Sequence, residues 1–121
     1  MQNIRSENTV IEKMMFSQLK QYRLKFKKHY GVAGRPDIAF PDKKVAVFLD
    51  SDFWHGWHFN KTRNKLPVVY WRGKIEGNIA RDRRNFYRLR RSGWKVVRLW
   101  EHQILENPEL CAKRIKEIVK T

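Results

Sequence analysis

The sequence predicts a small domain of the α/β or α+β class, in which helices flank a short mixed β-sheet. Three observations support this prediction: two short apolar runs separated by a turn, a third run rich in β-branched and aromatic residues, and intervening segments with helical spacing of apolar residues. The predicted order is helix, strand, strand, loop, helix, strand, helix, which permits a sheet covered by helices. Because the chain has 121 residues, we expect one domain spanning residues 1–121.

The first predicted element is an amphipathic helix from about Val10 to Lys28. Thr9 and Glu12 match a capping box, with Thr9 as the N-cap and Glu12 at the third helical position. The apolar stripe consists of Ile11, Met15, Leu19, Tyr22 and Phe26. Two interpretations of Glu12 stay open, because it can be a cap alone or also an acid of a catalytic site.

The next predicted element is a β-hairpin made of Ile38–Phe40 and Val45–Leu49, with Pro41 to Lys44 as the turn. Asp37 stands at the entrance of the first strand and Asp50 at the exit of the second. Because the strands of a hairpin are antiparallel, these two ends lie side by side. The pattern therefore predicts that two carboxylates meet in space.

Residues 51–70 are predicted to form a long loop that contains His55, His58 and several aromatic residues. A connection of this length in a small domain is usually functional. Phe53 and Trp54 have two interpretations: they wedge into a stack of bases, or they fill the core below the hairpin.

A second helix is predicted from about Tyr70 to Arg91. Its apolar stripe, Ile75, Ile79, Phe86 and Leu89, also contains Asp82. A carboxylate at such a position is either ion-paired with an arginine, for which Arg81, Arg83 and Arg84 are candidates, or it faces the site and orients a histidine. The arginines around it make the densest basic patch of the sequence.

The last predicted elements are a strand over residues 94–100, with Glu101 and His102 at its end, and a helix that starts at Asn107-Pro108. The helix has an apolar stripe made of Leu110, Cys111, Ile115, Ile118 and Val119. The glycine of Ser92-Gly93 closes the preceding helix.

The composition predicts a polyanionic partner. A total of 27 Lys and Arg against 12 Asp and Glu gives a net charge of +15. Nucleic acid is the favoured partner because the aromatic content of 13% offers surfaces that can stack on bases. No apolar run is long enough to span a membrane and no signal peptide is evident, so we expect a cytoplasmic protein, and a monomer. The single cysteine excludes an internal disulfide.

The hairpin carboxylates and His55 together suggest metal-assisted phosphodiester cleavage. Asp37 and Asp50 offer the oxygen ligands that Mg²⁺ prefers, and an imidazole close by can move a proton.

Five segments taken together resemble the very-short-patch-repair (Vsr) mismatch endonucleases of the restriction-endonuclease-like superfamily. They are Thr9-x-x-Glu12, Gly34-Arg35-Pro36-Asp37, Asp52-Phe53-Trp54-His55-Gly56, Asn78 with Asp82-Arg83-Arg84, and Gly93-Trp94-x-Val96 with Trp100-Glu101. The resemblance runs in order over nearly the whole chain. It implies a Mg²⁺-dependent enzyme that nicks one DNA strand beside a T:G mismatch.

The resemblance also implies roles for single residues. Asp37 is the central metal ligand with the Leu49 carbonyl nearby, His55 is the proton carrier, Asp82 orients it, and Glu12 is a further acid of the site. Phe53, Trp54 and Trp71 match the aromatic residues that wedge into the base stack, while Lys74 and Asn78 match positions on the helix that faces DNA; Arg81 and Arg84 belong to the basic patch of that helix.

Three departures from the family pattern stand out. The positions that commonly bind a structural zinc are Asp52, Trp57, Phe59 and His102 here, and no four-ligand site can be built from them. We therefore expect no structural zinc, the alternative being a rearranged site with Asp52, His58 and His102. Asp50 stands where one branch of the family has histidine, which makes it a candidate second Mg²⁺ ligand. The chain is also short at its N-terminus.

The sequence thus predicts a Vsr-like endonuclease. Two alternatives use the same basic charge: a non-catalytic domain that binds mismatched or distorted DNA, and a less selective nuclease of defence systems or mobile elements.

Overall fold

The computed structural model describes residues 9–52 and 69–120. Along these ranges the elements are α1 (Val10–Gln21), β1 (Lys27–Lys28), β2 (Ile38–Phe40), the 3-10 helix η1 (Pro41–Lys43), β3 (Val45–Asp50), α3 (Val69–Arg91), β4 (Lys95–Trp100), α4 (Glu101–Glu106) and α5 (Pro108–Val119). The predicted α+β arrangement is confirmed.

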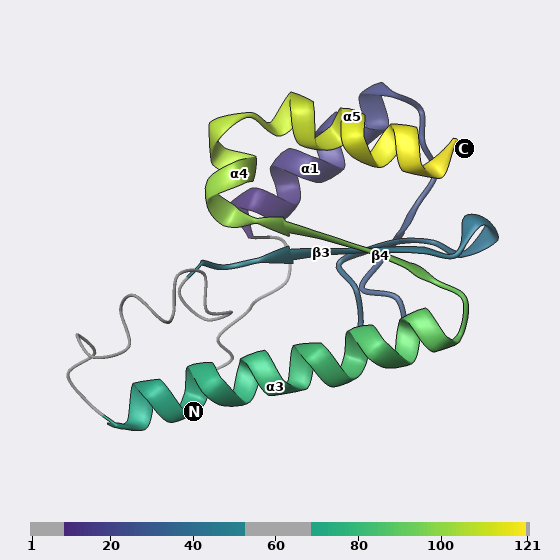
Figure 1. The fold of residues 1–121 in the computed structure, drawn as a ribbon. Helices are drawn as coiled ribbons and strands as arrows, with labels where there is room; N and C mark the ends of the chain where they lie inside the picture. The colour runs from purple at the N-terminus through teal and green to yellow at the C-terminus, as the bar shows by residue number, and fades with distance from the viewer. Residues whose placement is uncertain (1–8, 53–68, 121) are drawn as a thin grey trace.

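The strands form one mixed sheet in the order β1-β2-β3-β4. The predicted hairpin is present, since β2 and β3 pair antiparallel with Ile38 opposite Val47, whereas β3 and β4 run parallel. The chain passes from β3 to the parallel strand β4 through the long helix α3. Figure 1 shows that α1, α4 and α5 cover one face of the sheet and that α3 lies along the other.

Strand β3 is buried on both faces and therefore divides two hydrophobic clusters. Its odd-numbered residues Val45, Val47 and Leu49 belong to the larger cluster, between the sheet and α1, α4 and α5. Ala46 and Phe48 belong to a smaller cluster with Phe86 and Leu89 of α3. Burial on both faces explains why β3 is continuously apolar in sequence instead of alternating.

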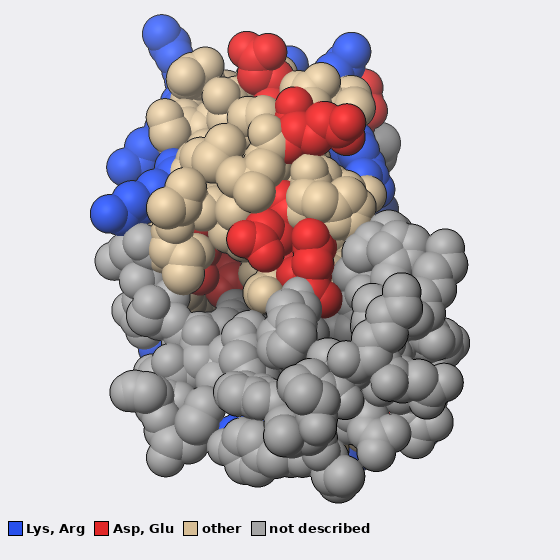
Figure 2. Space-filling view, turned by 90° about the vertical axis from the view of Figure 1, so that its left-hand side faces the viewer, with Lys and Arg blue, Asp and Glu red and all other residues tan. Residues whose placement is uncertain are grey.

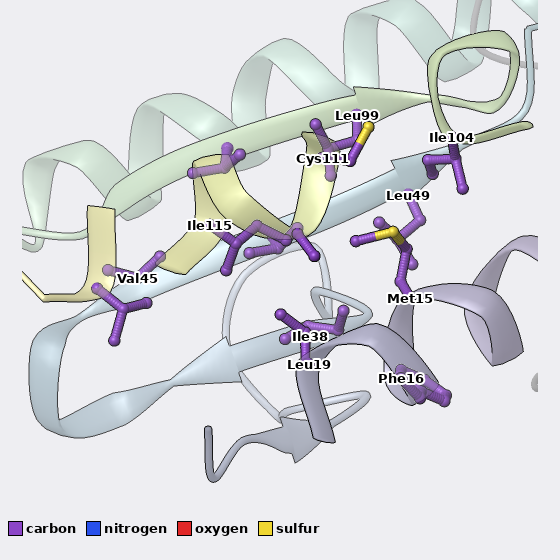
Figure 3. Close-up of a cluster of buried hydrophobic side chains, with 14 of the residues drawn as sticks. Met15, Phe16, Leu19, Ile38, Val45, Leu49, Leu99, Ile104, Cys111 and Ile115 are labelled. Carbon is purple, nitrogen blue, oxygen red and sulfur yellow. The ribbon is translucent and has the colours of Figure 1, made fainter. Parts of the chain in front are cut away.

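The larger cluster is filled by side chains from every helix above the sheet. Figure 3 shows Met15 and Leu19 of α1 beside Leu49 and Ile38 of the sheet, with Cys111 and Ile115 approaching from α5. Each such side chain contributes about 1.5–3 kcal/mol through removal of apolar surface from water. Burial raises the pKa of the Cys111 thiol, although the charge of Arg114 acts in the opposite direction.

The first helix is shorter than predicted, because it ends at Gln21 and not at Lys28. Arg23 has a φ of 60°, in the left-handed region that a helix cannot continue through, and Leu24 N–H bonds to the Leu19 carbonyl across the turn. Phe26 falls at helical spacing in the sequence, yet it stacks on Phe16 at 5.6 Å between ring centroids from a segment that runs back along the sheet. The helical spacing of apolar residues thus continues to Phe26 in the sequence, although the helix itself ends at Gln21.

The residues beyond this turn form the edge strand β1, which the sequence did not predict. Lys28 lies opposite Ile38 in an antiparallel pair. The next pair in this register places His29 opposite Asp37, and the His29 N–H donates to the Asp37 carbonyl at 3.1 Å.

The remaining elements follow the predictions closely. The second predicted helix is α3, which begins one residue earlier than expected, and the third predicted strand is β4. The short helix α4 was not predicted; it contains Glu101 and His102, which were expected merely to follow the strand. The last helix begins at Pro108, where Asn107 accepts a hydrogen bond from Leu110 N–H at 3.0 Å. None of the helices in the two described ranges has the length and apolar character required to cross a bilayer.

Candidate active site

Asp37 lies fully buried where strand β2 begins, and its carboxylate is held against the end of β3. Asp37 Oδ2 accepts a hydrogen bond from Leu49 N–H at 2.8 Å. A carboxylate with no exposed surface is costly unless it is bonded or binds a cation. The antiparallel hairpin inferred from the sequence therefore places the Asp37 carboxylate beside Leu49, the residue immediately before Asp50.

The capping role of Glu12 is observed, whereas its role as an acid of a catalytic site stays a prediction. Its N–H donates to the Thr9 hydroxyl oxygen at 3.4 Å, its Oε1 accepts from the Thr9 N–H at 3.3 Å, and the capping box is complete. Yet Glu12 is only 3% exposed and lies in the same group of side chains as Asp37. Capping positions Glu12 in the first turn of α1, and the packing of α1 on the sheet turns that carboxylate toward the site.

His29 stands between these two carboxylates. Its Nε2 is 3.7 Å from Glu12 Oε1 and its Nδ1 is 3.9 Å from Asp37 Oδ1. One ligand atom from each of Glu12, His29 and Asp37 lies within 4.8 Å of the others. Two carboxylates and an imidazole from three separate segments are a donor set that suits a divalent cation. The residues present therefore fit a metal.

Asp50 belongs to a second group on the α3 side of the sheet. Asp50 Oδ2 accepts from Arg98 Nε at 2.8 Å, and Asp82 Oδ2 accepts from Arg98 Nη2 at 2.7 Å. The guanidinium carbon of Arg98 also lies 4.2 Å from the Trp100 ring centroid and 5.2 Å from that of Phe86. One arginine of β4 therefore links the end of β3 to α3.

The position of Asp82 on the apolar stripe of α3 is explained by this contact. Of the two interpretations, ion pairing is observed, with Arg98 of the neighbouring strand as a partner. The role of orienting a histidine stays a prediction, because His55 lies outside the described residues.

Two of the three residues considered for a rearranged zinc site meet in the structure. His102 Nδ1 is 2.9 Å from Asp52 Oδ1, and Asp52 N–H donates to Glu101 Oε1 at 3.4 Å. His58 lies outside the described residues, so the expectation that no structural zinc is bound stays a prediction.

Helix α3 carries exposed basic side chains along its length. Arg81 and Arg84 are exposed, while Lys74 and Asn78 are partly buried. Arg81 Nη2 donates to Asn78 Oδ1 at 2.8 Å, so these two side chains share one side of the helix. This helix therefore presents positive charge on the face of the sheet opposite α1 (Figure 1).

Three predicted aromatic residues and the predicted proton carrier are not covered by these observations. Phe53, Trp54 and His55 lie outside the described residues. The backbone of Trp71 belongs to α3, but its side chain is also outside the described part of the structure.

Sequence reasoning missed His29 and Arg98. His29 follows what was taken for the end of a helix, so nothing in its spacing connected it with Asp37; only the register of β1 against β2 makes them neighbours. Arg98 carried a signal that was available, because it is a charge inside an apolar strand.

The described part of the molecule carries a group of carboxylates at the end where β3 finishes. Figure 2 shows Asp and Glu side chains gathered on this face, with Lys and Arg side chains along its flanks. Such a surface repels a phosphate backbone unless a cation lies between them.

Comparison with known proteins identifies the family. Residues 1–61 match the family model described as DNA mismatch endonuclease Vsr. The chain is 36% identical over 123 residues to the type II nicking enzyme V.NmeDIP of Neisseria meningitidis serogroup C, covering 99% of this chain and 83% of that protein. It is 38% identical over 117 residues to the type II nicking enzyme V.XorIIP of Xanthomonas oryzae pv. oryzae, covering 93% and 85%.

A third relative carries the family name itself. The chain is 31% identical over 121 residues to the DNA mismatch endonuclease Vsr of Escherichia coli K12, covering 97% of this chain and 76% of that protein. The sheet with helices on both faces agrees with the restriction-endonuclease-like core that the resemblance implied. This chain is therefore a DNA endonuclease, a hydrolase, and it belongs to the Vsr family of DNA mismatch endonucleases.

Proposed function

We propose that this enzyme is a Mg²⁺-dependent endonuclease that hydrolyses one phosphodiester bond in one strand of duplex DNA, next to a T:G mismatch. The observation that carries the proposal is the buried carboxylate of Asp37, bonded to Leu49 N–H and grouped with Glu12 at the acidic end of the sheet. The family name and the nicking enzymes among the relatives support the reaction.

Asp37 is the proposed central metal ligand. The N–H and C=O groups of one strand residue point to the same side of the strand, so the Leu49 carbonyl is directed toward the edge where Asp37 binds its N–H. This supports Leu49 as a carbonyl ligand. A magnesium ion held there would stabilise the charge that develops on the scissile phosphate.

The other acids have proposed roles that follow from their positions. Glu12 is a further acid of the site, since its burial and its place beside His29 keep it near Asp37. Asp50 is a second carboxylate, oriented by the Arg98 guanidinium that binds its Oδ2. His55 is the proposed proton carrier and Asp82 its orienting partner.

DNA binding is assigned to α3 and to the aromatic residues. Arg81 and Arg84 neutralise phosphates, and Lys74 and Asn78 supply further contacts from the same helix. Phe53, Trp54 and Trp71 are proposed to wedge into the base stack beside the mismatch. We further propose that the enzyme acts as a monomer, since a nick requires a single active site. We also propose that it acts in the cytoplasm.

A nicking assay tests the proposal. Duplexes labelled on either strand, with a T:G mismatch or fully paired, are incubated with enzyme and Mg²⁺ or with a chelator. We expect cleavage of one strand of the mismatched duplex only with metal. Asp37→Asn should lower the rate on the order of 10³-fold, because loss of a metal ligand removes several kcal/mol of transition-state stabilisation.

Asp42→Asn is the matched control, because this exposed aspartate of the η1 turn undergoes the same chemical change far from the group. Cleavage that persists in chelator overturns the metal requirement, and equal rates for Asp37→Asn and wild type overturn the site.

A second candidate function is a nuclease that hydrolyses the same bond but has no preference for a mismatch. Several relatives are named only as type II nicking enzymes. Equal cleavage of mismatched and paired duplexes would favour this less selective nuclease over the repair enzyme.

A further inference from the structure

We propose that His29 is a direct ligand of the divalent metal together with Glu12 and Asp37, and that its imidazole raises the affinity of the site for Mn²⁺ and Co²⁺ above that of a site made of oxygen ligands alone. This inference rests on the proposed metal site and adds a nitrogen ligand to it. The sequence pattern that defines the site contains carboxylates at residues 12 and 37 but says nothing of residue 29.

The geometry of the three side chains comes first. His29 contacts both carboxylates through different ring nitrogens, with Nε2 3.7 Å from Glu12 Oε1 and Nδ1 3.9 Å from Asp37 Oδ1. Two ligands of one ion that lie about 2.1 Å from it are separated by about 3 to 4 Å, depending on the angle between them. One ion binds a single ring nitrogen, and one ligand atom from each of Glu12, His29 and Asp37 lies within 4.8 Å of the others, so small side-chain rotations would bring one imidazole nitrogen and the two carboxylates into range of a shared ion.

The imidazole also has an unused donor atom inside the group. His29 Nε2 is buried and has no hydrogen-bond partner among the described residues. A buried polar nitrogen without a partner costs on the order of 1–3 kcal/mol. Coordination of a metal by this lone pair would remove that cost, and the neighbouring carboxylates would supply the negative charge.

The backbone around His29 is built to hold it in this place. His29 has a φ of 48°, a left-handed conformation, and its N–H donates to the Asp37 carbonyl at 3.1 Å. Its own carbonyl accepts from Arg35 Nε at 3.2 Å, and Tyr30 N–H donates to the Pro36 carbonyl at 3.2 Å. These bonds tie the His29 turn to the segment that leads into Asp37, so the two ligands are fixed relative to each other before a metal arrives.

The choice of metal follows from ligand chemistry. Magnesium strongly prefers oxygen ligands, whereas an imidazole increases the affinity for first-row transition metals in the order Mn²⁺, Fe²⁺, Co²⁺. A site of two carboxylates and one imidazole should therefore favour these ions more than a site made of oxygen alone.

The test is pulsed electron paramagnetic resonance of the full chain with one equivalent of Mn²⁺. An imidazole nitrogen bound to Mn²⁺ produces a nitrogen-14 modulation of the electron spin echo, which water and carboxylate ligands do not produce. We expect the modulation in wild type and its loss in His29→Asn. Asparagine suits this change because it tolerates positive φ. Calorimetry should show at least a tenfold weaker Mn²⁺ affinity and a smaller change for Mg²⁺.

Two further variants make the result decisive. His102→Asn is the matched control, since this histidine pairs with Asp52 outside the group, and it should keep the modulation. His29→Asp also tolerates positive φ and replaces nitrogen by oxygen; we expect it to bind Mn²⁺ without nitrogen modulation, with its preference moved toward Mg²⁺. This variant decides the question if His29→Asn fails to fold by circular dichroism.

Absence of modulation in wild type overturns the inference, as does modulation that survives in His29→Asp. A histidine held only as an ion-pair partner of the two carboxylates would give the first of these results. Metal-dependent nicking by an enzyme without nitrogen modulation would overturn the role of His29 as a metal ligand and leave the proposed function intact. Modulation without any nicking would sink the proposed function instead.

Discussion

Arg98 binds Asp50 with its Nε 2.8 Å from the carboxylate oxygen Oδ2, so that the acid ending strand β3 is held by the adjacent parallel strand. Asp50 is 1% exposed, and Arg98 is its ion-pair partner across the sheet. The same guanidinium reaches Asp82 on α3. Loss of Arg98 would thus leave two carboxylates without this cation at the point where α3 meets the sheet.

The first prediction concerns this arginine. Arg98→Met should lower the free energy of unfolding by about 3 kcal/mol, because it removes the cation that binds the buried Asp50 carboxylate at 2.8 Å. Urea unfolding followed by circular dichroism measures the effect. Arg90→Met is the control: Arg90 also lies over the Phe86 ring, at 5.9 Å, but it is exposed, and its loss should change stability by less than about 0.5 kcal/mol. Equal effects of the two substitutions would contradict a structural role for the bridge.

The second prediction separates the two roles of Glu12. Glu12→Gln keeps a side chain that can complete the capping box but removes the charge, so stability should hold while the nicking rate falls. Thr9→Ala should do the reverse, with a loss of about 1 kcal/mol of stability and little loss of rate under native conditions. Thermal unfolding and the nicking assay are run on both variants. If Glu12→Gln cuts as fast as wild type, Glu12 is a cap alone.

The third prediction concerns DNA binding by α3. Arg81→Ala and Arg84→Ala should each weaken binding to all duplexes and reduce the slope of log affinity against log salt by about 1, as expected for one lost phosphate contact. Fluorescence anisotropy in an Asp37→Asn background measures binding without cleavage. Lys113→Ala removes an exposed positive charge from α5, on the other face of the sheet, and should leave the slope unchanged. An equal change in all three variants would point to net charge and not to a defined DNA face.

The fourth prediction concerns the approach to Asp37. Gly34 has a φ of 78°, and a Cβ there would lie 3.0 Å from Asn85 Cβ and 3.1 Å from the Phe48 ring. Gly34→Ala should therefore destabilise the protein by more than about 1 kcal/mol, since it adds backbone strain and a clash between α3 and the sheet. Gly31→Ala is the matched control, because a Cβ at Gly31 meets nothing within 4 Å. Differential scanning calorimetry should show a lower melting temperature for Gly34→Ala alone.

Local signals in the sequence were sufficient for most of the elements. The hairpin was recognisable from two apolar runs around Pro41 and Asp42, and the N-terminus of α1 from Thr9 and Glu12, because turn and cap chemistry act over three or four residues. The end of α1 was not recognisable in this way. Phe26 continues the helical periodicity, but its side chain packs on Phe16 and Phe40 from the chain that returns to the sheet, and tertiary packing overrides the local pattern.

Residue types and short spacings were sufficient to predict the class of fold, the candidate carboxylates Glu12, Asp37 and Asp50, the basic residues of α3 and the resemblance to the family. Which of these groups lie in contact depends on how the strands pair and how the helices pack on the sheet. The register of β1 against β2 places His29 beside Asp37, in the group that also contains Glu12. The parallel pairing of β3 with β4 brings Arg98 next to Asp50. Both contacts join residues from separate segments, and no local pattern encodes which strand lies next to which.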